Sequence, residues 1–338
     1  MEAGFEETLA AAARTAATRV FERPMLAPWV AEVDLGDNRL EFRADRFRFA
    51  LTAELWITAY HALRPFLGGS RRLEEVLAES DPAIPAAVKL FLLQVLQQNS
   101  LILDGDDEVL RRGAEPDAAP QGAGLFFSRF SQQPGRLQGA VANARMALVG
   151  DPAHTESLGE LLSGFGAQAT GLFGSLQDLE RASPRPPGWD LITFFVPHSR
   201  PDELDAINAW ALDRRQRWLR VVWGTASGIL GPTFIPFQTA CQRCLNSRAA
   251  SHDRPGSPAQ GTAPIVMPGP LTALLVGQTA LEALRLVSGY VPPVTVGRYY
   301  HIDSRRPEAE GHDVLRIPRC PACGHGTLLR RIWDKPGQ

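Results

Sequence analysis

Alternating hydrophobic and polar positions predict a small α/β domain early in the chain. Residues 31–36, 39–45 and 46–52 alternate as short strands do, with Asp37-Asn38 as the first turn. Apolar residues then recur at helical spacing, and a short apolar run follows. The predicted elements are helices over 53–66, from a cap at Ser70 to about Leu77 and over 85–98, then a strand at 101–103. Three strands, three helices and a closing strand are typical of a winged-helix-like domain.

The second part of the chain has a different pattern, in which short apolar strands alternate with helices. Strands are predicted around 147–150, 190–196 and 218–222, and a long apolar helix over 271–286. This alternation is typical of an α/β domain with an open parallel sheet. The polar run over 111–124 predicts a linker. We therefore expect a winged-helix-like domain over 1–110 and a Rossmann-type parallel-sheet domain over 125–338.

Composition narrows the class of protein. Hydrophobic residues make up 44% of the chain and charged residues 21%, as in ordinary soluble globular proteins. The net charge of −2 argues against a nucleic-acid partner. No apolar run approaches the length needed to span a membrane, and residues 1–20 lack the features of a secretion signal. A cytoplasmic location is expected.

Four cysteines form two C-x-x-C turns, Cys241/Cys244 and Cys320/Cys323. Each such turn presents two thiolates to one ion, so together they predict a tetrahedral zinc site. Four sulfur ligands leave no open position, and such a zinc is structural and not catalytic. Two disulfides or unmetallated thiols are the alternatives. His325 is a further candidate ligand, although four thiolates already complete the shell.

The strand at 147–150 ends where a nucleotide-binding fold places its glycine-rich phosphate loop. Such a loop needs glycines and free backbone amides beside the phosphates. Only Gly150 is in place, because Asp151 adds a negative charge and Pro152 removes a donor. Tight ATP binding is therefore not expected.

The predicted third strand and third helix suggest a peptide site rather than a DNA site. A DNA reader needs basic residues along its recognition helix, and this helix offers Lys89 alone. The third strand could instead accept an added peptide strand. Phe47, Phe49 and Leu51 alternate suitably, although the same alternation is expected if all three face the core.

The segment GPTFIPFQTACQRCLNSR at 231–248, the helix LTALLVGQTALEALRLVSG at 271–289 and PRCPACG at 318–324 carry a family resemblance. Over roughly 125–330 the chain resembles the ThiF/MoeB superfamily of ubiquitin-activating-enzyme-like adenylyltransferases. The resemblance implies structural zinc on the four cysteines, and it leaves a homodimer open because these proteins often dimerise. The sequence departs from the family where GDPAHTE replaces the ATP loop, and where Pro197-His198 replaces an aspartate that positions magnesium.

With its front domain, the chain is similar to the leader-peptide-binding, ocin-ThiF-like proteins of thiazole/oxazole-modified microcin clusters. The resemblance implies a RiPP recognition element that binds the precursor leader peptide as an added strand, between the third strand and third helix. It also implies a YcaO-type partner that performs the ATP-dependent cyclodehydration. The implied peptide-binding residues are Arg46, Phe47, Arg48, Phe49, Leu51, Lys89, Leu90, Leu93, Gln94 and Gln97.

Two other functions stay open. One is an active adenylyltransferase that uses ATP to activate a peptide or carrier-protein carboxylate. The other is a winged-helix regulator with a zinc-bound sensor domain, against which the nearly uncharged third helix argues. No residue pattern indicates a catalytic nucleophile or general base, so the expected protein is not an enzyme by itself.

Overall fold

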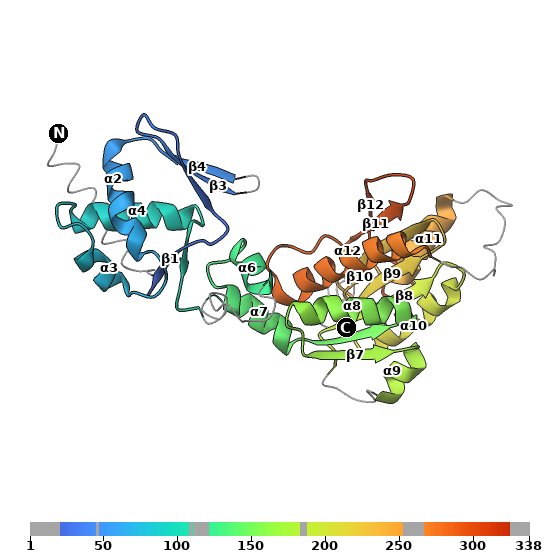
Figure 1. The fold of residues 1–338 in the computed structure, drawn as a ribbon. Helices are drawn as coiled ribbons and strands as arrows, with labels where there is room; N and C mark the ends of the chain where they lie inside the picture. The colour runs from blue at the N-terminus through green and yellow to red at the C-terminus, as the bar shows by residue number, and fades with distance from the viewer. Residues whose placement is uncertain are drawn as a thin grey trace, which may run out of the picture. The chain divides into compact units, whose positions relative to one another are not determined.

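The computed structural model describes residues 21–44, 47–107, 110, 122–182, 188–252 and 267–324. The chain divides into two compact units, Met1–Gly139 and Ala140–Gln338 (Figure 1). Most of the predicted linker over 111–124 lies outside the described residues. Helix α6 (Gly122–Ser128) groups with the first unit, and α7 (Pro134–Asn143) spans the division.

The first unit contains the three predicted strands as an antiparallel sheet in the order β2-β3-β4. Their bounds are β2 Ala31–Asp34, β3 Leu40–Ala44 and β4 Phe47–Leu51. The turn between β2 and β3 falls on Asp37 and Asn38, as predicted, with φ of 47° and 56°. Short polar side chains tolerate this left-handed backbone better than branched or bulky ones. The register then pairs Phe42 of β3 with Phe49 of β4.

The three predicted helices and the predicted closing strand follow. The elements are α2 Glu54–Leu63, the 3₁₀ turn η1 Arg64–Phe66, α3 Leu73–Glu79, α4 Ala86–Gln98 and β5 Ile102–Asp104. Ser70 does not cap α3. That helix starts after Arg72, whose N–H donates to the Glu75 carboxylate at 2.8 Å. Strand β5 pairs antiparallel with β1 (Pro24–Leu26), which has no alternating pattern of its own.

The core of the first unit lies between the β2-β3-β4 sheet and helices α2 and α4. The ring of Phe42 from β3 meets Tyr60 of α2 edge-on, with centroids 4.9 Å apart. Trp56 of α2 packs on Phe91 of α4 at 5.3 Å. The order of the elements agrees with the predicted three strands, three helices and closing strand. The assignment of this unit to the winged-helix class stays a prediction.

The second unit is built on a seven-stranded sheet in the order β12-β11-β10-β9-β8-β6-β7. The strands are β6 Arg145–Val149, β7 Ala169–Phe173, β8 Leu191–Pro197, β9 Trp218–Trp223, β10 Ser227–Phe234, β11 Arg298–Asp303 and β12 Glu310–Asp313. Strands β7, β6, β8 and β9 are parallel, as predicted. The expectation of a wholly parallel sheet was wrong, because β10, β11 and β12 run antiparallel. Only three residues separate β9 from β10, and such a short connection joins antiparallel strands.

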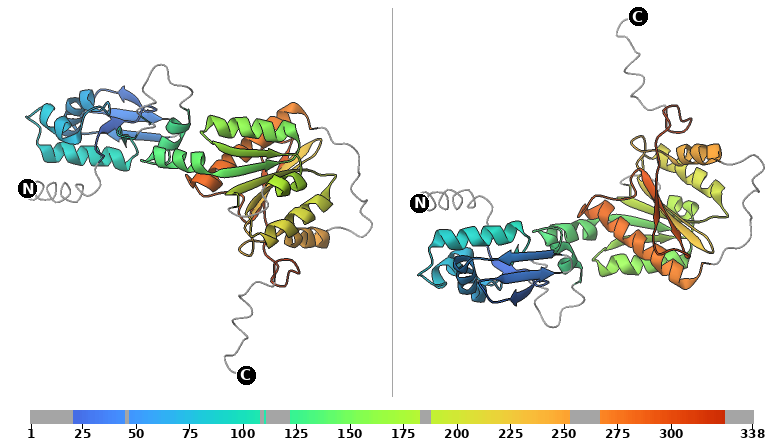
Figure 2. Two further views of the ribbon diagram at one scale, coloured as in Figure 1. Left: turned by 90° about the horizontal axis from the view of Figure 1, so that it is seen from below. Right: turned by 90° about the horizontal axis from the view of Figure 1, so that it is seen from above.

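Helices cover both faces of this sheet (Figures 1 and 2). On one face lie α8 (Pro152–Gly164) and α12 (Gly269–Ser288), which pack on each other and on β6, β8 and β10. The other face carries α9 (Leu176–Ala182), α10 (Pro201–Asp213) and α11 (Gln242–His252). An α/β unit with both faces covered is the architecture that the alternating pattern predicted.

Helix α12 corrects the expectation that no segment is long enough to cross a membrane. By length and composition alone its 20 residues could do so. However, Leu275, Ala283 and Leu284 are fully buried against α8 and the sheet. Glu282 is buried too, and it accepts hydrogen bonds from the N–H and hydroxyl of Thr295. The apolar composition of α12 is therefore explained by packing within the unit.

Candidate functional site

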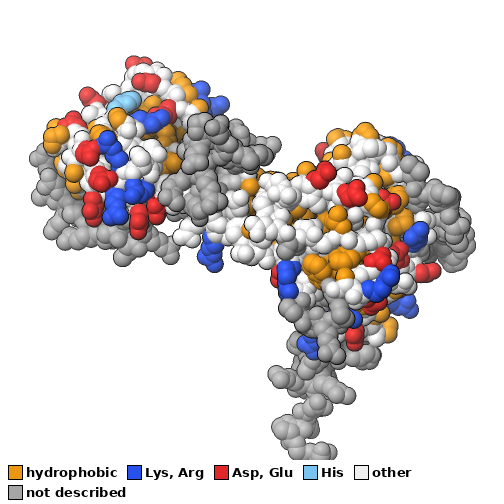
Figure 3. Space-filling view, turned by 60° about the horizontal axis from the view of Figure 1, so that its bottom comes forward, with side chains coloured by type: hydrophobic (Ala, Val, Ile, Leu, Met, Phe, Trp, Pro, Cys, Tyr) orange, Lys and Arg blue, Asp and Glu red, His pale blue; other side chains and the backbone are white. Residues whose placement is uncertain are grey.

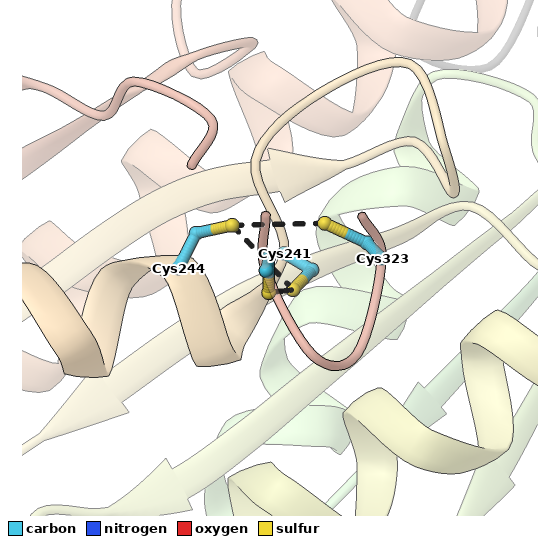
Figure 4. Close-up of side chains that lie close together, drawn as sticks. Cys241, Cys244 and Cys323 are labelled. Atoms are coloured by element: carbon cyan, nitrogen blue, oxygen red, sulfur yellow. Dashed lines mark hydrogen bonds between the residues drawn. The ribbon is translucent and has the colours of Figure 1, made fainter. Parts of the chain in front are cut away.

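The structure brings all four predicted cysteines together. Cys241 and Cys244 lie at the start of α11, and Cys320 and Cys323 lie on the turn after β12. Figure 4 shows the sulfurs of the labelled cysteines, Cys241, Cys244 and Cys323, pointing toward one another. All four Sγ atoms lie within 4.8 Å of one another, and all four residues are buried.

The spacing of these sulfurs fits a tetrahedral ion. Four ligands at about 2.3 Å from one ion place neighbouring sulfurs about 3.8 Å apart. The Sγ–Sγ distances are 3.8 Å for Cys241–Cys244, 3.7 Å for Cys241–Cys320 and 3.6 Å for Cys244–Cys323. A disulfide requires about 2.05 Å, so the four are free thiols and the disulfide alternative does not hold here. The set could hold a metal ion.

Burial opposes the charged thiolate form of two of these cysteines in the absence of an ion. Burial raises the pKa of the Cys241 thiol well above its usual range and that of Cys323 to about 11. Burial opposes ionisation of Cys320, but hydrogen bonds from the backbone amides of Cys323 and Ala322 and from the thiols of Cys244 and Cys241 together lower its pKa to about 7. The Ile317 N–H donates to the Cys244 sulfur at 3.4 Å, as a thiolate-binding amide does. A bound cation would stabilise all four as thiolates.

Two arginines fasten the C-terminal cysteine turn to the body of the unit. Arg316 donates to the carbonyls of Phe237, at 2.7 Å, and of Cys323. Arg248 of α11 donates to the Leu315 carbonyl at 2.8 Å. Position 324 requires a glycine, because a Cβ atom there would lie 2.4 Å from the Cys320 carbonyl oxygen. These contacts explain how turns 75 residues apart come to share one centre.

At the phosphate-loop position, the N-terminus of α8 has no free first-turn donor. Asp151 caps the helix, and its carboxylate accepts from the Ala153 N–H at 2.9 Å. The N–H groups of His154 and Thr155 both donate to the Asp151 carbonyl at 3.1 Å, and Pro152 has none. Gly150 is needed for packing, because a Cβ there would lie 2.4 Å from the Phe195 carbonyl oxygen. A phosphate would meet a carboxylate here instead of a cradle of amides.

Sequence reasoning did not identify His154 of α8 as a buried residue. Its ring is 5.4 Å from that of Phe195 and 4.9 Å from that of Trp223. Neither ring nitrogen has a hydrogen-bond partner within the described chain, and the residue is 4% exposed. Burial lowers the pKa of His154, an effect that the Asp151 carboxylate at 3.7 Å only partly offsets. Burial therefore favours the neutral form of this histidine.

The predicted peptide site has one open strand edge. Strand β4 is the last strand of the β2-β3-β4 order, so among the described residues its outer edge pairs with no strand. Arg48 is exposed, whereas Phe47, Phe49 and Leu51 pack against the core of the first unit. The core-facing alternative for these three residues is thus what the structure has. Arg46 lies outside the described residues.

Helix α4 divides the other predicted peptide-binding residues into two groups. Leu93 is 1% exposed and Lys89 2% exposed, so both belong to the interior. The Lys89 ammonium donates to the carbonyls of Ser80, at 3.2 Å, and Leu77, at 3.3 Å, which ties α4 to the end of α3. Leu90, Gln94 and Gln97 remain half-buried. The Gln97 side chain already makes one hydrogen bond, because its amide nitrogen donates to the Gln132 side chain at 3.2 Å.

Charges of both signs alternate on the surface. On the face drawn in Figure 3, basic side chains lie beside acidic ones over the first unit. Arg71 pairs with Glu79, and Arg64 pairs with Glu32 at 2.6 Å. Paired charges of this kind do not provide the continuous basic surface that a nucleic-acid backbone needs.

The fold of this chain is similar to that of several solved structures. One is a heterocyclase in complex with substrate and cofactor, with a TM-score of 0.66 and 19% identity over 94% of this chain. Another is the heterocyclase TruD, with a TM-score of 0.65, 19% identity and 94% coverage. This chain spans 41% and 45% of the length of those two proteins.

Escherichia coli MccB has the same fold over nearly its whole length. MccB with MccA-N7isoAsn gives a TM-score of 0.62 and 13% identity, covering 89% of this chain and 99% of that one. Another solved form of MccB contains ATP. No protein-family model and no curated protein matches the sequence. At these identities the likeness establishes the fold, which is consistent with the predicted ThiF-like one.

Proposed function

We propose that this chain is a leader-peptide-binding scaffold of ribosomal peptide natural-product biosynthesis. It recruits a precursor peptide through its first unit and presents it to a YcaO-type cyclodehydratase, which forms the azoline rings of a thiazole/oxazole product. The fold it shares with heterocyclases and with MccB, which has been solved with MccA, supports this role. The partner enzyme, the cytoplasmic location and a homodimer are parts of the same proposal.

The observation that carries the proposal is the closed N-terminus of α8. An adenylating enzyme needs donors there to hold phosphates. In this chain the first-turn amides of Ala153, His154 and Thr155 are already used, and Asp151 places a carboxylate at the same point. This arrangement supports a chain that binds and assembles rather than one that activates a carboxylate.

The peptide would add to β4 as a fourth strand of the β2-β3-β4 sheet. Backbone hydrogen bonds along an open edge supply affinity, and side chains on the neighbouring helix supply selectivity. Arg48 of β4 and the half-buried Leu90 and Gln94 of α4 are the accessible members of the predicted set. Lys89 and Leu93 act through the packing of α4 and not through contact with the peptide.

We also propose that the ion held by the four cysteines is zinc. Four sulfur donors at tetrahedral spacing are the set that zinc prefers. Cys241 and Cys244 on α11, with Cys320 and Cys323 on the C-terminal turn, would hold it. Such an ion supplies a crosslink and no reaction chemistry.

The test pairs two measurements on the full chain loaded with zinc. A synthetic leader segment, taken from a precursor encoded beside this chain's gene, should bind with micromolar or better affinity by fluorescence anisotropy. The same sample should show no ATP–pyrophosphate exchange with the whole precursor. Absence of binding to every such leader, or exchange by the purified protein alone, overturns the scaffold role.

One observation favours a second candidate, an adenylyltransferase that activates a peptide carboxylate. MccB shares this fold over nearly its full length and has been solved with ATP. The two candidates differ at one measurable point. Only the adenylyltransferase releases pyrophosphate from ATP when the precursor is added.

A further inference from the structure

Two adjoining cavities lie on the α10–α11 face of the second unit, at the carboxyl ends of β8 and β9. Their volumes are about 220 Å³ and about 320 Å³. Both are lined by His198, Val222 and Ile229, so they share a wall. The smaller one extends between the sheet and α11, past Arg220 and Gln242. Neither belongs to the four-cysteine centre or to the α8 loop.

Arg220 is a buried cation in the wall of the smaller cavity, and no carboxylate of the described chain pairs with it. The residue is 8% exposed. One guanidinium nitrogen donates to the Gly231 carbonyl at 3.0 Å, and the buried Nε has no partner among the described residues. Burial lowers the pKa of Arg220 to about 10, so it stays charged at neutral pH. A buried charge without a counter-ion is unfavourable, and an anionic ligand would relieve that cost.

The other polar groups of the smaller cavity also suit a ligand with oxygen atoms. Gln242 is 2% exposed, and its Oε1 has no partner in the described structure. Its amide nitrogen donates to Asn246 at 2.7 Å, and Asn246 in turn donates to Asp205 at 3.0 Å. Asp205 is thus engaged, and it does not line either cavity.

Apolar side chains make up the remainder of the smaller cavity and limit what can enter. Leu204 of α10 and Leu245 and Ala249 of α11 stand opposite Val222 and Ile229 of the sheet. A small cavity with one apolar wall and a few placed polar groups is the usual form of a small-molecule site. A fully hydrated inorganic anion would leave this wall unused.

From this juxtaposition we infer that the α10–α11 cavity binds a small organic carboxylate with an apolar side chain, such as an N-acylated amino acid. The carboxylate pairs with the Arg220 guanidinium, whose planar fork matches carboxylate geometry. The apolar part packs against Leu204 and Leu245, and an N–H of the ligand donates to Gln242 Oε1. This inference stands apart from the proposed leader site, which lies in the first unit.

The site is coupled to the metal centre through α11. Cys241 and Cys244 belong to the four-cysteine centre, while Gln242 and Leu245, next to them on the same helix, line the cavity. The Gln242 N–H donates to Asn208 of α10 at 3.0 Å, which fixes this helix start against α10. Release of the metal would therefore displace one wall of the cavity, and chelation should abolish ligand binding.

The experiment titrates the zinc-loaded full chain with N-acetyl-leucine and with N-acetyl-leucinamide, which has the same shape without the charge. Isothermal titration calorimetry or NMR shift mapping reads the affinity. We expect the acid to bind at least about tenfold more tightly than the amide, because a buried charge-assisted pair is lost in the amide. Arg220→Gln should remove this preference. Arg306→Gln removes the same charge from a cavity on the opposite face and should leave it unchanged.

Equal affinity for acid and amide in the wild-type protein overturns the inference, as does unchanged acid binding by a folded Arg220→Gln variant. Binding of inorganic phosphate alone, without the acid, overturns the carboxylate assignment. The acid–amide comparison uses the wild-type chain only, so the inference is tested even if the Arg220 variant does not fold. Leader binding is measured separately and is not affected by any of these results.

Discussion

The Sγ atom of Cys241 lies 3.8 Å from that of Cys244 and 3.7 Å from that of Cys320, within a set of four possible ligands to one ion. Removing one ligand leaves three buried thiols and a weakened site. Cys241→Ser should release the metal and destabilise the second unit by about 3 kcal/mol or more, because metal binding is coupled to folding. This corresponds to roughly 6–12 °C in Tm for a unit of this size.

Metal content by mass spectrometry and thermal unfolding followed by tryptophan fluorescence would check this prediction. Ser247→Ala is a matched control on α11, because that side chain is exposed and only its hydroxyl bond to the Arg243 carbonyl is lost. Wild-type protein that carries no metal, or a Cys241 variant as stable as the control, contradicts the structural role.

His154 gives the second unit a pH dependence of known sign. Its folded pKa is lowered by burial, whereas an unfolded histidine titrates near 6.5. Below pH 6.5 the unfolded chain therefore binds the extra proton. Stability is fully present above that pH and falls as the pH drops, by up to about 1.4 kcal/mol per pH unit.

Urea unfolding at pH 7.5 and pH 5.5, read by tryptophan fluorescence, measures this loss. His154→Phe keeps an aromatic ring between Phe195 and Trp223 and should flatten the dependence. Ser157→Ala changes an exposed, non-titrating side chain of α8 and should keep the wild-type slope. The account of His154 fails if the Phe variant loses as much stability as the wild type between the two pH values.

At the scale of elements, α4 separates residues that build the first unit from residues that can contact a ligand. Leu93→Ala removes a buried side chain and should cost about 2–5 kcal/mol of stability. Leu90→Ala combined with Gln94→Ala changes half-buried positions and should leave stability nearly unchanged. On the proposed function, the double variant weakens leader binding about tenfold, close to 1.4 kcal/mol.

Chemical denaturation and anisotropy titration distinguish these effects. Val33→Ala on β2, the strand at the other edge of the three-stranded sheet, is the control and should bind the leader as the wild type does. Unchanged affinity in a folded Leu90/Gln94 double variant would place the peptide elsewhere.

Local pattern predicted most elements of the first unit because their periodicity reports the face that they bury. Strands β2, β3 and β4 and helix α4 each lie within one or two residues of the predicted bounds. Strand β1 escaped because three residues, Pro24 to Leu26, carry no alternation, and its pairing with β5 joins residues about 80 apart. The burial of Lys89 could not be predicted from the sequence pattern either. Its charge suggests solvent, but carbonyls from the end of α3 satisfy it inside the unit.

At the scale of the whole molecule, the metal centre was predictable and the mixed sheet was not. Cysteine spacing encodes a ligand set directly, and the structure brings the four sulfurs together. Strand direction depends on connections that pattern does not report. Strand β12, with the sequence EGHD, has no hydrophobic alternation at all. Similarly, the missing phosphate loop could be read from Asp151 and Pro152, but the burial of His154 against Phe195 and Trp223 required the fold.

The closed first turn of α8 predicts that the chain does not bind ATP tightly. Because the first turn of α8 has no free donor, millimolar ATP should not raise the Tm of the chain by more than about 1 °C. Differential scanning fluorimetry with and without Mg·ATP measures the shift, and MccB, solved with ATP, is the positive control. A shift as large as that of MccB contradicts the closed-loop interpretation.

Hydrogen–deuterium exchange with and without the leader peptide shows whether that peptide is captured as a strand on β4. Backbone amides of β4, Phe47 to Leu51, should become protected when the leader is added, together with the exposed side of α4. Binding that leaves β4 exchange unchanged, or protects only the second unit, would contradict capture on β4.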